Sequence, residues 1–547
     1  MKKFNSSLEA FIYWEKEAPN NLFLNQLFEK NNKPLSYAEA GIEIRKIASY
    51  LLKLGLPKKS HVAILSKNCS HWILADLAIS MAGFISIPIY PTLMAKGVGQ
   101  ILTHSEAKAI FIGKLDDFDS QKEGIPDIPV ISVKTFGGIA GTLWEDIIER
   151  ESGLMDFTMP KRDDLYTIIY TSGTTGQPKG AMHTVGNFSN AATAFNQAIP
   201  LPGNPKFLSY LPLAHVAERA FCSGILFFGG QITFAHSLES FAKNLESVQP
   251  DVFFAVPRIW TKIQESILEN LPQRKLSMLL AIPIVNTLVK KKINTKLGLA
   301  NATFICSGAA PIAPNLVNWY ANLGITILQG YGMTEDCCVS HTNLKSANKI
   351  GTVGKALADV SIKLSVDNEI CIKNKCLFKG YYKAPDITTR VFDKEGYFKT
   401  GDIGEYDKEG FLTITGRVKD QFKTDKGKYI SPSPLELQFS KNTDIEQICI
   451  VGTGLPQPIA LITASAIGKA KKREELVASL SNFIQTLNPT LKKHEKIEKV
   501  VVLQNDWTVE NGMTTPTLKI KRNRIEKNYR PLYKSWYELE QKVVFES

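Results

Sequence analysis

Residues 170–180 form a dense run of hydroxyl and glycine residues, Tyr-Thr-Ser-Gly-Thr-Thr-Gly-Gln-Pro-Lys-Gly. Backbone N–H groups and hydroxyl donors in such a run can surround phosphate oxygens, and Lys179 adds a positive charge. The order does not fit a Walker A loop, which needs Gly-Lys followed by Ser or Thr, because Lys179 here precedes Gly180 and Ala181. We therefore predict a phosphate-binding loop of another kind, placed directly after a strand-like segment.

Two carboxylates and one arginine further along the chain suit the other parts of a nucleotide. Glu335 follows a strand-like run and Gly-Tyr-Gly, where a hard oxygen ligand suits Mg²⁺. Asp402 can accept hydrogen bonds from both ribose hydroxyls, and Arg417 can reach the same sugar or the phosphate. The segment 307–311, Ser-Gly-Ala-Ala-Pro, closes another strand-like run with residues small enough to admit a flat base.

Several of these segments, in this order, resemble motifs of the adenylate-forming (AMP-binding) superfamily, which includes acyl-CoA synthetases, firefly luciferase and peptide-synthetase adenylation domains. The resemblance covers nearly the whole chain. The matching segments are 170–180 for phosphate, 329–335 for adenine and magnesium, 397–402 for ribose, 416–420 for an interdomain hinge and 515–522 for a terminal lysine.

The resemblance implies a set of roles for individual residues. It implies Mg²⁺ as cofactor, held by Thr171 and Glu335, with ATP and coenzyme A as substrates. Lys419 takes the hinge position, and Lys519 and His215 take catalytic positions. The residues expected to bind ATP are Thr171, Ser172, Gly173, Thr174, Thr175, Gly176, Lys179, Gly308, Ala309, Gln329, Gly330, Tyr331, Gly332, Thr334, Asp402, Arg417 and Lys423.

Lys519 is the residue that we expect to assist the chemical step. Attack of a carboxylate on the α-phosphate brings two anions together, and a positioned ammonium stabilises the charge that develops. The family commonly has glycine before this lysine, whereas this chain has Leu518, so Lys521 remains the alternative. The neighbouring bases Lys521, Arg522 and Arg524 also allow a solvated basic face without a catalytic role.

The segments 210–219 and 256–260 resemble the long-chain fatty acyl branch of the superfamily, as does the additional sequence between about 265 and 300. By this resemblance His215 gates an acyl channel or packs against the adenylate, although a purely structural histidine stays open. Three functions remain: a long-chain fatty acid–CoA ligase, an enzyme that loads an acyl carrier protein, and a nucleotide-binding regulator without catalysis. The third function is disfavoured, because a protein without catalysis has no reason to keep all five charged motif residues, which are Lys179, Glu335, Asp402, Arg417 and Lys519.

Strand-like runs that alternate with helix-length segments predict an α/β fold with largely parallel sheets. The runs are 61–66, 166–172, 251–256, 302–307 and 324–330, and a capping box at Ser36–Glu39 predicts the start of a helix. After about residue 358 the pattern becomes β-rich. We expect a large N-terminal domain over 1–417 and a small, mobile α+β domain over 418–547 that carries the terminal lysine.

The chain has 547 residues, a formal net charge of +12 and a pI of about 9.0. The positive charge suits a polyanionic cofactor or an anionic membrane surface, while no nucleic-acid-binding motif is found. Its eight cysteines form no CxxC pair, and the first residues lack the apolar core of a signal peptide, so we expect a reducing cytoplasm.

Two apolar stretches raise the question of membrane contact. Residues 71–91 include Asp76 and Gly83 and predict a helix, a turn and a buried strand. Residues 276–292 are too short to span a bilayer and end in three lysines. We expect this second stretch to pack within the protein, with shallow insertion at the inner face of a membrane as the alternative.

Overall fold

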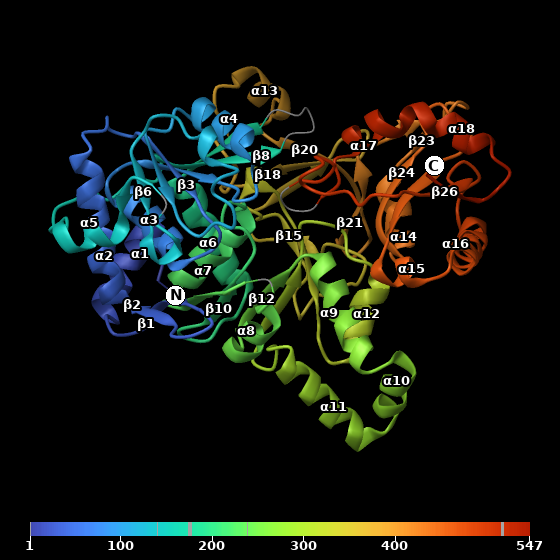
Figure 1. Ribbon diagram of the computed structural model, residues 1–547, viewed down its shortest axis with the longest axis horizontal. Coiled ribbons are helices and arrows are strands. Elements are labelled where there is room, and N and C mark those ends of the chain that lie inside the picture. Colours follow the sequence, from blue (N-terminus) through green and yellow to red (C-terminus); the bar gives the residue numbers. More distant parts are fainter. Residues whose placement is uncertain (1, 139, 173–177, 238, 516–518, 547) are drawn as a thin grey trace.

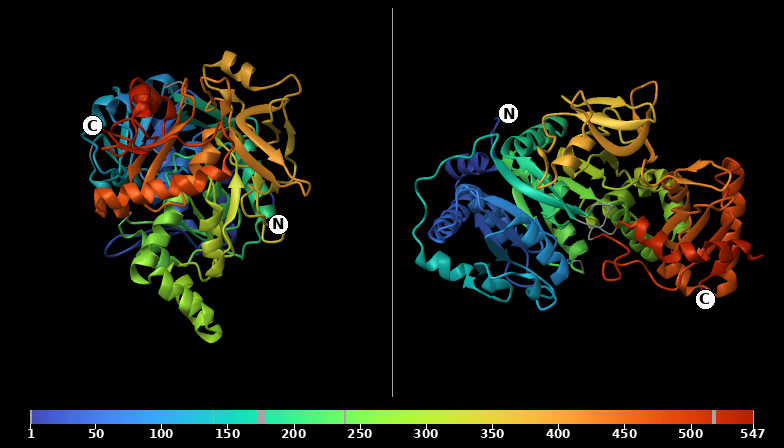
Figure 2. Two further views of the ribbon diagram at one scale, coloured as in Figure 1. Left: turned by 90° about the vertical axis from the view of Figure 1, so that its right-hand side faces the viewer. Right: turned by 90° about the horizontal axis from the view of Figure 1, so that it is seen from above.

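A computed structural model describes residues 2–138, 140–172, 178–237, 239–515 and 519–546. Figure 1 shows two large sheets with helices packed around them, and a smaller C-terminal part to one side. The view from above in Figure 2 shows this C-terminal part as a separate body beside the rest. The predicted α/β architecture with a small α+β C-terminal part is confirmed.

The first large sheet has eight strands and is parallel from β8 to β7. Strand β9 pairs antiparallel with β8, and β19 pairs antiparallel with β9. In spatial order the strands are β19 (Gly380–Tyr381), β9 (Pro178–Thr184), β8 (Leu165–Ser172), β4 (Ile85–Ile89), β3 (His61–Leu65), β5 (Ala109–Ile112), β6 (Val130–Ser132) and β7 (Thr142–Leu143).

The second large sheet has nine strands, parallel in its centre and antiparallel at both edges. Its order is β16 (Lys355–Ala356), β15 (His341–Thr342), β14 (Leu328–Tyr331), β13 (Phe304–Ser307), β12 (Val252–Ala255), β10 (Lys206–Ser209), β11 (Gln231–Phe234), β1 (Leu22–Gln26) and β2 (Lys33–Ser36). The run predicted at 324–330 becomes a strand only from Leu328, although Ile325 and Ile327 before it are buried in the core.

Helices fill the space between the two sheets and cover their outer faces. Helix α3 is buried almost throughout, in the core cluster that joins strands of both sheets. The predicted helix and strand within 71–91 are confirmed, with Gly83 in the left-handed conformation at the turn. The helices are α1 (Ser7–Glu17), α2 (Tyr37–Lys53), α3 (Ser70–Met81), α4 (Ala95–Ser105), α5 (Trp144–Arg150), α6 (Val185–Ala198), α7 (Val216–Phe227), α8 (Phe241–Val248), α9 (Pro257–Asn270), α10 (Gln273–Ala281), α11 (Pro283–Lys296), α12 (Pro314–Asn322) and α13 (Pro385–Val391).

The predicted capping box is present at the start of α2. The Ser36 hydroxyl accepts the Glu39 backbone N–H at 3.2 Å, and the Glu39 carboxylate accepts the Ser36 backbone N–H at 2.8 Å. Two N–H groups that would lack partners at a helix start are therefore satisfied.

The later part of the chain is built on smaller sheets. An antiparallel sheet contains β17 (Ser361–Leu364), β18 (Glu369–Lys373), β20 (Phe398–Tyr406) and β21 (Leu412–Arg417). The C-terminal part contains β22 (Phe422–Lys423), β23 (Tyr429–Ile430), β24 (Ile445–Val451), β25 (Ile459–Ala464), β26 (Lys499–Val502) and β27 (Val543–Phe545). Its helices are α14 (Pro432–Phe439), α15 (Ala466–Ala470), α16 (Arg473–Leu487), α17 (Arg522–Tyr529) and α18 (Tyr533–Glu538).

Short 3₁₀ turns connect several of these elements. They are η1 (Lys122–Gly124), η2 (Lys134–Phe136), η3 (Thr334–Asp336), η4 (Asn488–Thr490) and η5 (Arg530–Leu532). Helices α10 and α11 extend below the body in both Figure 1 and the left view of Figure 2. Of the two helices only Leu276 is fully buried, so the expectation that this stretch packs within the protein is wrong for most of it. Across the described ranges, none of the helices combines the length and apolar character that crossing a bilayer requires.

A buried ion pair ties α7 to α3. Arg219 donates to the Asp76 carboxylate at 2.5 Å, to the Ser86 hydroxyl at 2.8 Å and to the Thr167 hydroxyl at 2.6 Å. The same carboxylate accepts the Tyr166 hydroxyl at 2.5 Å. The Arg219 and Asp76 side chains are 2% and 6% exposed, so water cannot replace either partner.

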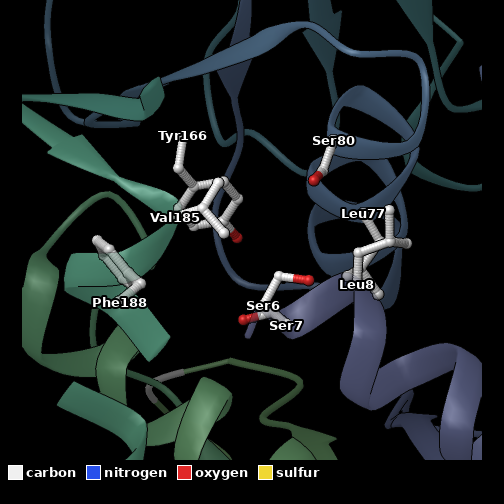
Figure 3. Close-up of a pocket in the computed structure, with 8 residues that line it drawn as sticks. All are labelled: Ser6, Ser7, Leu8, Leu77, Ser80, Tyr166, Val185 and Phe188. Atoms are coloured by element: carbon white, nitrogen blue, oxygen red, sulfur yellow. The ribbon is translucent and has the colours of Figure 1, made fainter. Parts of the chain in front are cut away.

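A small pocket lies beside this network, between α1, α3, β8 and α6 (Figure 3). Tyr166 and Phe188 contribute aromatic walls, and Ser6, Ser7 and Ser80 contribute hydroxyl groups. Its volume of about 10 Å³ corresponds to about one water molecule. We therefore treat it as a packing feature and not as a substrate site.

Arg219→Leu should destabilise the N-terminal part by about 3–5 kcal/mol, because it leaves the Asp76 carboxylate buried and unpaired. Denaturant unfolding followed by tryptophan fluorescence measures this loss. The double variant Asp76→Leu/Arg219→Leu should recover most of it. Arg150→Ala, which breaks only an exposed pair with Asp146, should change the free energy of unfolding by less than about 1 kcal/mol. An equally small effect for Arg219→Leu would contradict the assigned importance of the pair.

Candidate active site

The predicted phosphate-binding segment lies in a β-hairpin. Strands β8 and β9 pair with Thr171 opposite Lys179 and Ser172 opposite Pro178. Sequence analysis missed β9, because Pro178 and Gly180 are poor strand formers and nothing in the run shows its antiparallel partner. The predicted residues Gly173, Thr174, Thr175 and Gly176 lie outside the described residues.

Glu335, Tyr381 and Lys179 meet beside this hairpin. The Tyr381 hydroxyl donates to Glu335 Oε1 at 2.6 Å, and Lys179 Nζ lies 5.4 Å from the centroid of the Tyr381 ring. Burial raises the pKa of Tyr381, so its hydroxyl stays a donor. Sequence analysis missed Tyr381; it is placed by pairing of β19 with β9, which no local pattern announces.

The donor set at Glu335 fits Mg²⁺. Magnesium takes one or two carboxylates and completes its shell with water and phosphate oxygens. Glu335 supplies a carboxylate and Lys179 the positive charge that phosphate needs nearby, while Thr171 lies opposite Lys179 in the hairpin with its hydroxyl 3.5 Å from the Lys179 carbonyl oxygen. Glu335 and Lys179 interact electrostatically, which places the carboxylate and the ammonium on the same site. No cluster of three or more metal-ligating side chains occurs among the described residues, so the phosphate would have to supply part of the shell.

The segments predicted to bind adenine lie side by side at the ends of β13 and β14. Ser307 pairs with Gln329 in this parallel register, which places Gly308 and Ala309 next to Gly330. A Cβ at Gly308 would lie 3.3 Å from the Gly330 carbonyl oxygen, and Ala309 adopts a φ of +66°. The backbone is thus closely packed here, as a flat ligand pressed against it would require.

The loop after β14 turns sharply into η3. A Cβ at Gly332 would come within 2.5 Å of the Cys338 Cα, so a side chain at this position would force the loop open. Thr334 is the first residue of η3, and Glu335 follows it. The tight turn therefore holds Glu335 close to the adenine segments.

Asp402 is fixed through both of its carboxylate oxygens. Oδ2 accepts the Tyr331 hydroxyl at 2.8 Å, and Oδ1 accepts Arg417 Nε–H at 2.7 Å. Asp402 and Arg417 are also direct partners in the register of β20 and β21. The Asp402 carboxylate raises the pKa of Arg417, so the guanidinium stays charged over the physiological range. Three residues predicted from separate motifs are thus in contact.

Lys519 reaches this cluster from the C-terminal part. Its side chain is exposed, yet the surrounding protein displaces enough water to lower the pKa of its ammonium. Arg417 lowers this pKa further, while the Asp402 carboxylate opposes the shift. Burial lowers the pKa of Lys521 as well, but the charge that acts on it is that of its neighbour Arg524. The structure therefore brings Lys519, and not Lys521, to the predicted nucleotide residues.

His215 lies at the start of α7, where its Nδ1 accepts the Ala217 backbone N–H at 3.2 Å. Burial lowers the pKa of His215 to about 4, and the charge of Lys519 contributes. The imidazole is therefore neutral at physiological pH, with its proton on Nε2. His215 and Lys519 are 304 positions apart in the sequence, yet they are close enough to interact electrostatically.

The basic run after Lys519 is only partly solvated, because Arg524 is exposed while Arg522 is buried. The Arg522 side chain is 8% exposed; it donates to the Ile450 carbonyl at 2.6 Å and forms an ion pair with Glu436. These contacts tie the segment that carries Lys519 to the core of the C-terminal part. The backbone N–H of Lys519 itself donates to the Thr515 hydroxyl oxygen at 3.1 Å.

The predicted hinge residue Lys419 lies in the turn that follows β21 and is exposed. Its charge helps to lower the pKa of Lys179, so the hinge lies near the phosphate segment. Lys423 lies in β22 with its Nζ 5.6 Å from the centroid of the Tyr429 ring. Within the described contacts, nothing joins Lys423 to Asp402 or Lys179.

Described side chains of the C-terminal part contact α9 and the core cluster beside it. Arg258 forms an ion pair with Glu446 of β24, and both side chains are partly exposed. Leu437 of α14 packs against the core cluster that contains Trp260 and Tyr320. These contacts accompany the orientation in which Lys519 faces Asp402. Sequence analysis did not find them, because the two surfaces are distant in the chain.

Residues 13–382 match the family of AMP-binding enzymes, and residues 419–541 match the AMP-binding enzyme C-terminal domain. The chain belongs to the AMP-binding enzyme family. The family resemblance stated from the motifs is therefore confirmed, including its long-chain fatty acid–CoA ligase branch.

Among curated relatives, the chain is 28% identical to long-chain-fatty-acid–CoA ligase FadD15 of Mycobacterium bovis, covering 94% of each chain. It is 30% identical to the peroxisomal long chain acyl-CoA synthetase 6 of Arabidopsis thaliana, covering 90% of this chain and 79% of the relative. Among solved structures, the adenylation domain of a carboxylic acid reductase from Segniliparus rugosus superposes with a TM-score of 0.79 at 19% identity, covering 97% and 94% of the two chains. The o-succinylbenzoate CoA synthetase of Bacillus subtilis gives 0.75 at 20% identity, covering 94% and 97%.

Asp402→Ala should weaken ATP binding at least about tenfold, because it removes an ionised hydrogen-bond acceptor from the predicted ribose site. Tyr331→Phe keeps the carboxylate and removes one donor to it, so we expect a smaller loss of about two- to fivefold. Isothermal titration of each variant with ATP measures both. Equal affinities for Asp402→Ala and the unaltered protein would remove Asp402 from the site.

Proposed function

We propose that this protein is an ATP-dependent acyl-CoA synthetase, an acid–thiol ligase that activates a long-chain fatty acid as an acyl-adenylate and transfers it to coenzyme A. The observation that carries the proposal is the meeting of Lys519 with Asp402 and Arg417. The relatives named as long-chain fatty acid–CoA ligases and acyl-CoA synthetases support the substrate class.

In the first proposed half-reaction, a carboxylate oxygen of the acid attacks the α-phosphorus of ATP. The bond to the bridging oxygen breaks and pyrophosphate leaves, so that the acyl-adenylate remains. Lys519 orients the two anions and stabilises the charge on the α-phosphate oxygens. Lys179 neutralises the leaving phosphates, and Asp402 holds the ribose. Mg²⁺ bound by Glu335 and Thr171 would supply further positive charge at the phosphates.

In the second proposed half-reaction, the thiol of coenzyme A gives up its proton to water, its sulfur attacks the acyl carbon, and AMP leaves with the electrons of the broken acyl–oxygen bond. The thiol must first reach a centre that Lys519 faces in the observed orientation. We infer that the domain over 418–547 turns about Lys419 and withdraws Lys519 before thiol attack. His215 is neutral at physiological pH, so it can line the acyl or adenylate site without adding charge.

The acceptor distinguishes this proposal from its alternative. An acyl carrier protein could take the acyl group in place of coenzyme A, and one similar solved structure is a didomain of an adenylation domain with a carrier domain. Release of an acyl-CoA thioester with coenzyme A as sole acceptor supports the ligase. A regulator without catalysis would form neither adenylate nor thioester.

We further propose that the protein works in the cytoplasm and binds peripherally to the inner face of a membrane. Long-chain fatty acids partition into bilayers, so an enzyme at the surface meets a higher substrate concentration.

Turnover with a fatty acid and Mg²⁺·ATP should release AMP and pyrophosphate in equal amounts. A coupled pyrophosphate assay with acids of increasing chain length, together with chromatography of the nucleotides, measures this. Chelation of Mg²⁺ should abolish release. ADP as the nucleotide product would contradict the proposal.

Lys519→Ala should slow formation of the acyl-adenylate by at least about 10²–10³-fold, because a preorganised charge is lost from the transition state. Thioester formation from supplied acyl-adenylate and coenzyme A should remain nearly unchanged. Lys521→Ala is the matched control and should keep the first rate within a few-fold. Loss of adenylation in Lys521→Ala instead would move the role to that residue.

Lys419→Pro should have the opposite effect. Proline fixes φ and stiffens the turn, so adenylation should persist while the thioester step slows. Single-turnover measurements of the two half-reactions separate these outcomes. Equal losses in both steps would argue against a hinge at Lys419.

A further inference from the structure

Helices α10 and α11 form an arm whose tip carries unpartnered apolar side chains. Met278 is 71% exposed, Ile282 51%, Ile284 79% and Leu288 63%. Ile284 and Leu288 are four residues apart on α11, and Met278 and Ile282 have the same spacing at the end of α10, so each pair shares one face. Figure 1 shows both helices extending away from the sheets.

The base of the arm is held by contacts that do not involve these side chains. Leu276 is buried in the core cluster of α9 and α12. Trp319 Nε1 donates to Gln273 Oε1 at 2.8 Å, and Asn294 Nδ2 donates to the Leu323 carbonyl at 3.1 Å. At the bend, Asn286 Nδ2 donates to the Leu280 carbonyl at 2.7 Å. The arm is therefore a built element, and its apolar tip is not needed to hold it.

The charge around the tip has one sign. The sequence from 271 to 300 contains neither aspartate nor glutamate. Arg274 and Lys275 precede Met278 by four and three residues, and Lys291 and Lys292 follow Leu288 by three and four. All four cations are exposed. The remaining basic residues of the segment are Lys290 and Lys296.

We propose that the α10–α11 arm docks onto an anionic lipid bilayer, with Met278, Ile282, Ile284 and Leu288 inserted among the headgroups and acyl chains. The four flanking cations contact the lipid phosphates. An apolar strip bordered by cations is the surface that a negatively charged membrane binds. This inference deepens the membrane association proposed above, because it names the surface. It does not depend on the identity of the acid.

Vesicle sedimentation tests the docking surface. The full-length protein should sediment with vesicles that contain phosphatidylglycerol at low salt, and salt should release it by screening. Ile284→Glu/Leu288→Glu should lower the partition coefficient at least about tenfold, because two inserted apolar groups become anions. Ile42→Glu/Val366→Glu is the matched control: it adds the same charge at exposed positions elsewhere and should change partitioning less than about twofold.

A second pair of variants tests the electrostatic part. Lys291→Gln/Lys292→Gln should weaken binding to phosphatidylglycerol vesicles about tenfold and reduce its salt dependence, with little effect on phosphatidylcholine vesicles. Lys492→Gln/Lys493→Gln removes two adjacent exposed cations from the C-terminal part and should have a much smaller effect. Equal losses in both pairs would mean that the overall charge and not the arm drives binding, and would overturn the proposal.

Two further measurements distinguish lipid docking from self-association and from a failure of the proposed function. If sedimentation equilibrium without lipid shows a dimer that Ile284→Glu/Leu288→Glu dissociates, the tip is a contact between two copies, and the lipid proposal is overturned. Adenylation of a water-soluble acid without vesicles should be the same in all four variants. A protein that binds vesicles through the arm but forms no adenylate would refute the proposed function and leave the docking surface standing.

Discussion

The ion pair between Asp402 and Arg417 links the predicted nucleotide site to the predicted hinge. The two residues are partners on neighbouring strands, and Arg417 is the last residue of β21, directly before the turn that contains Lys419. The carboxylate is held by Tyr331 from the second large sheet as well. The residues predicted to bind the nucleotide and the turn that contains the predicted hinge are therefore directly connected by the backbone. Only two residues separate Arg417 from Asp420, the last residue of that turn. A displacement of the turn is therefore transmitted to the ion pair.

Positive charge converges on this junction from several directions. Lys179 comes from the β8–β9 hairpin, Arg417 from the antiparallel sheet and Lys519 from the C-terminal part. Burial lowers the pKa values of Lys179 and Lys519, and the neighbouring cations Lys419 and Arg417 lower them further, because bringing cations together costs free energy. A polyphosphate would relieve the repulsion. The accumulated positive charge of the site therefore favours binding of a strongly anionic ligand.

Sequence reasoning found the parts of the site that lie in contiguous motifs. Glycine, hydroxyl and charged residues concentrate there, and the need for glycine is visible at Gly332, where a Cβ would clash with the backbone of Cys338 in the same tight loop. The alternating strands and helices likewise indicated the parallel sheets, and the capping box located the start of α2 to the residue. The boundary predicted near residue 417 remains a prediction, as do the individual roles of the site residues.

What sequence reasoning missed depends on contacts between distant segments. Tyr381 reaches Glu335 only because β19 pairs with β9, in which its partner Ala181 lies 200 positions earlier in the chain. Strand β9 contains Pro178 and Gly180, two residue types that disfavour strands. The α10–α11 stretch looks apolar enough for the interior, and only its three-dimensional placement shows that the apolar side chains face outward. Local propensity carries no information about such long-range geometry.

The contact between Arg258 and Glu446 has a consequence for how the domain orientation is controlled. Both side chains are partly exposed, and an ion pair of this kind contributes about 0.2–1 kcal/mol. That amount alters the ratio of two orientations by only about 1.4- to 5-fold at 25 °C. This ion pair by itself therefore gives little preference for one orientation, and the packing of Leu437 against the core cluster of Trp260 and Tyr320 adds to it. In the proposed mechanism, pyrophosphate departure would remove several negative charges from the site at once, and the chemical step would thereby favour the rotation that follows it.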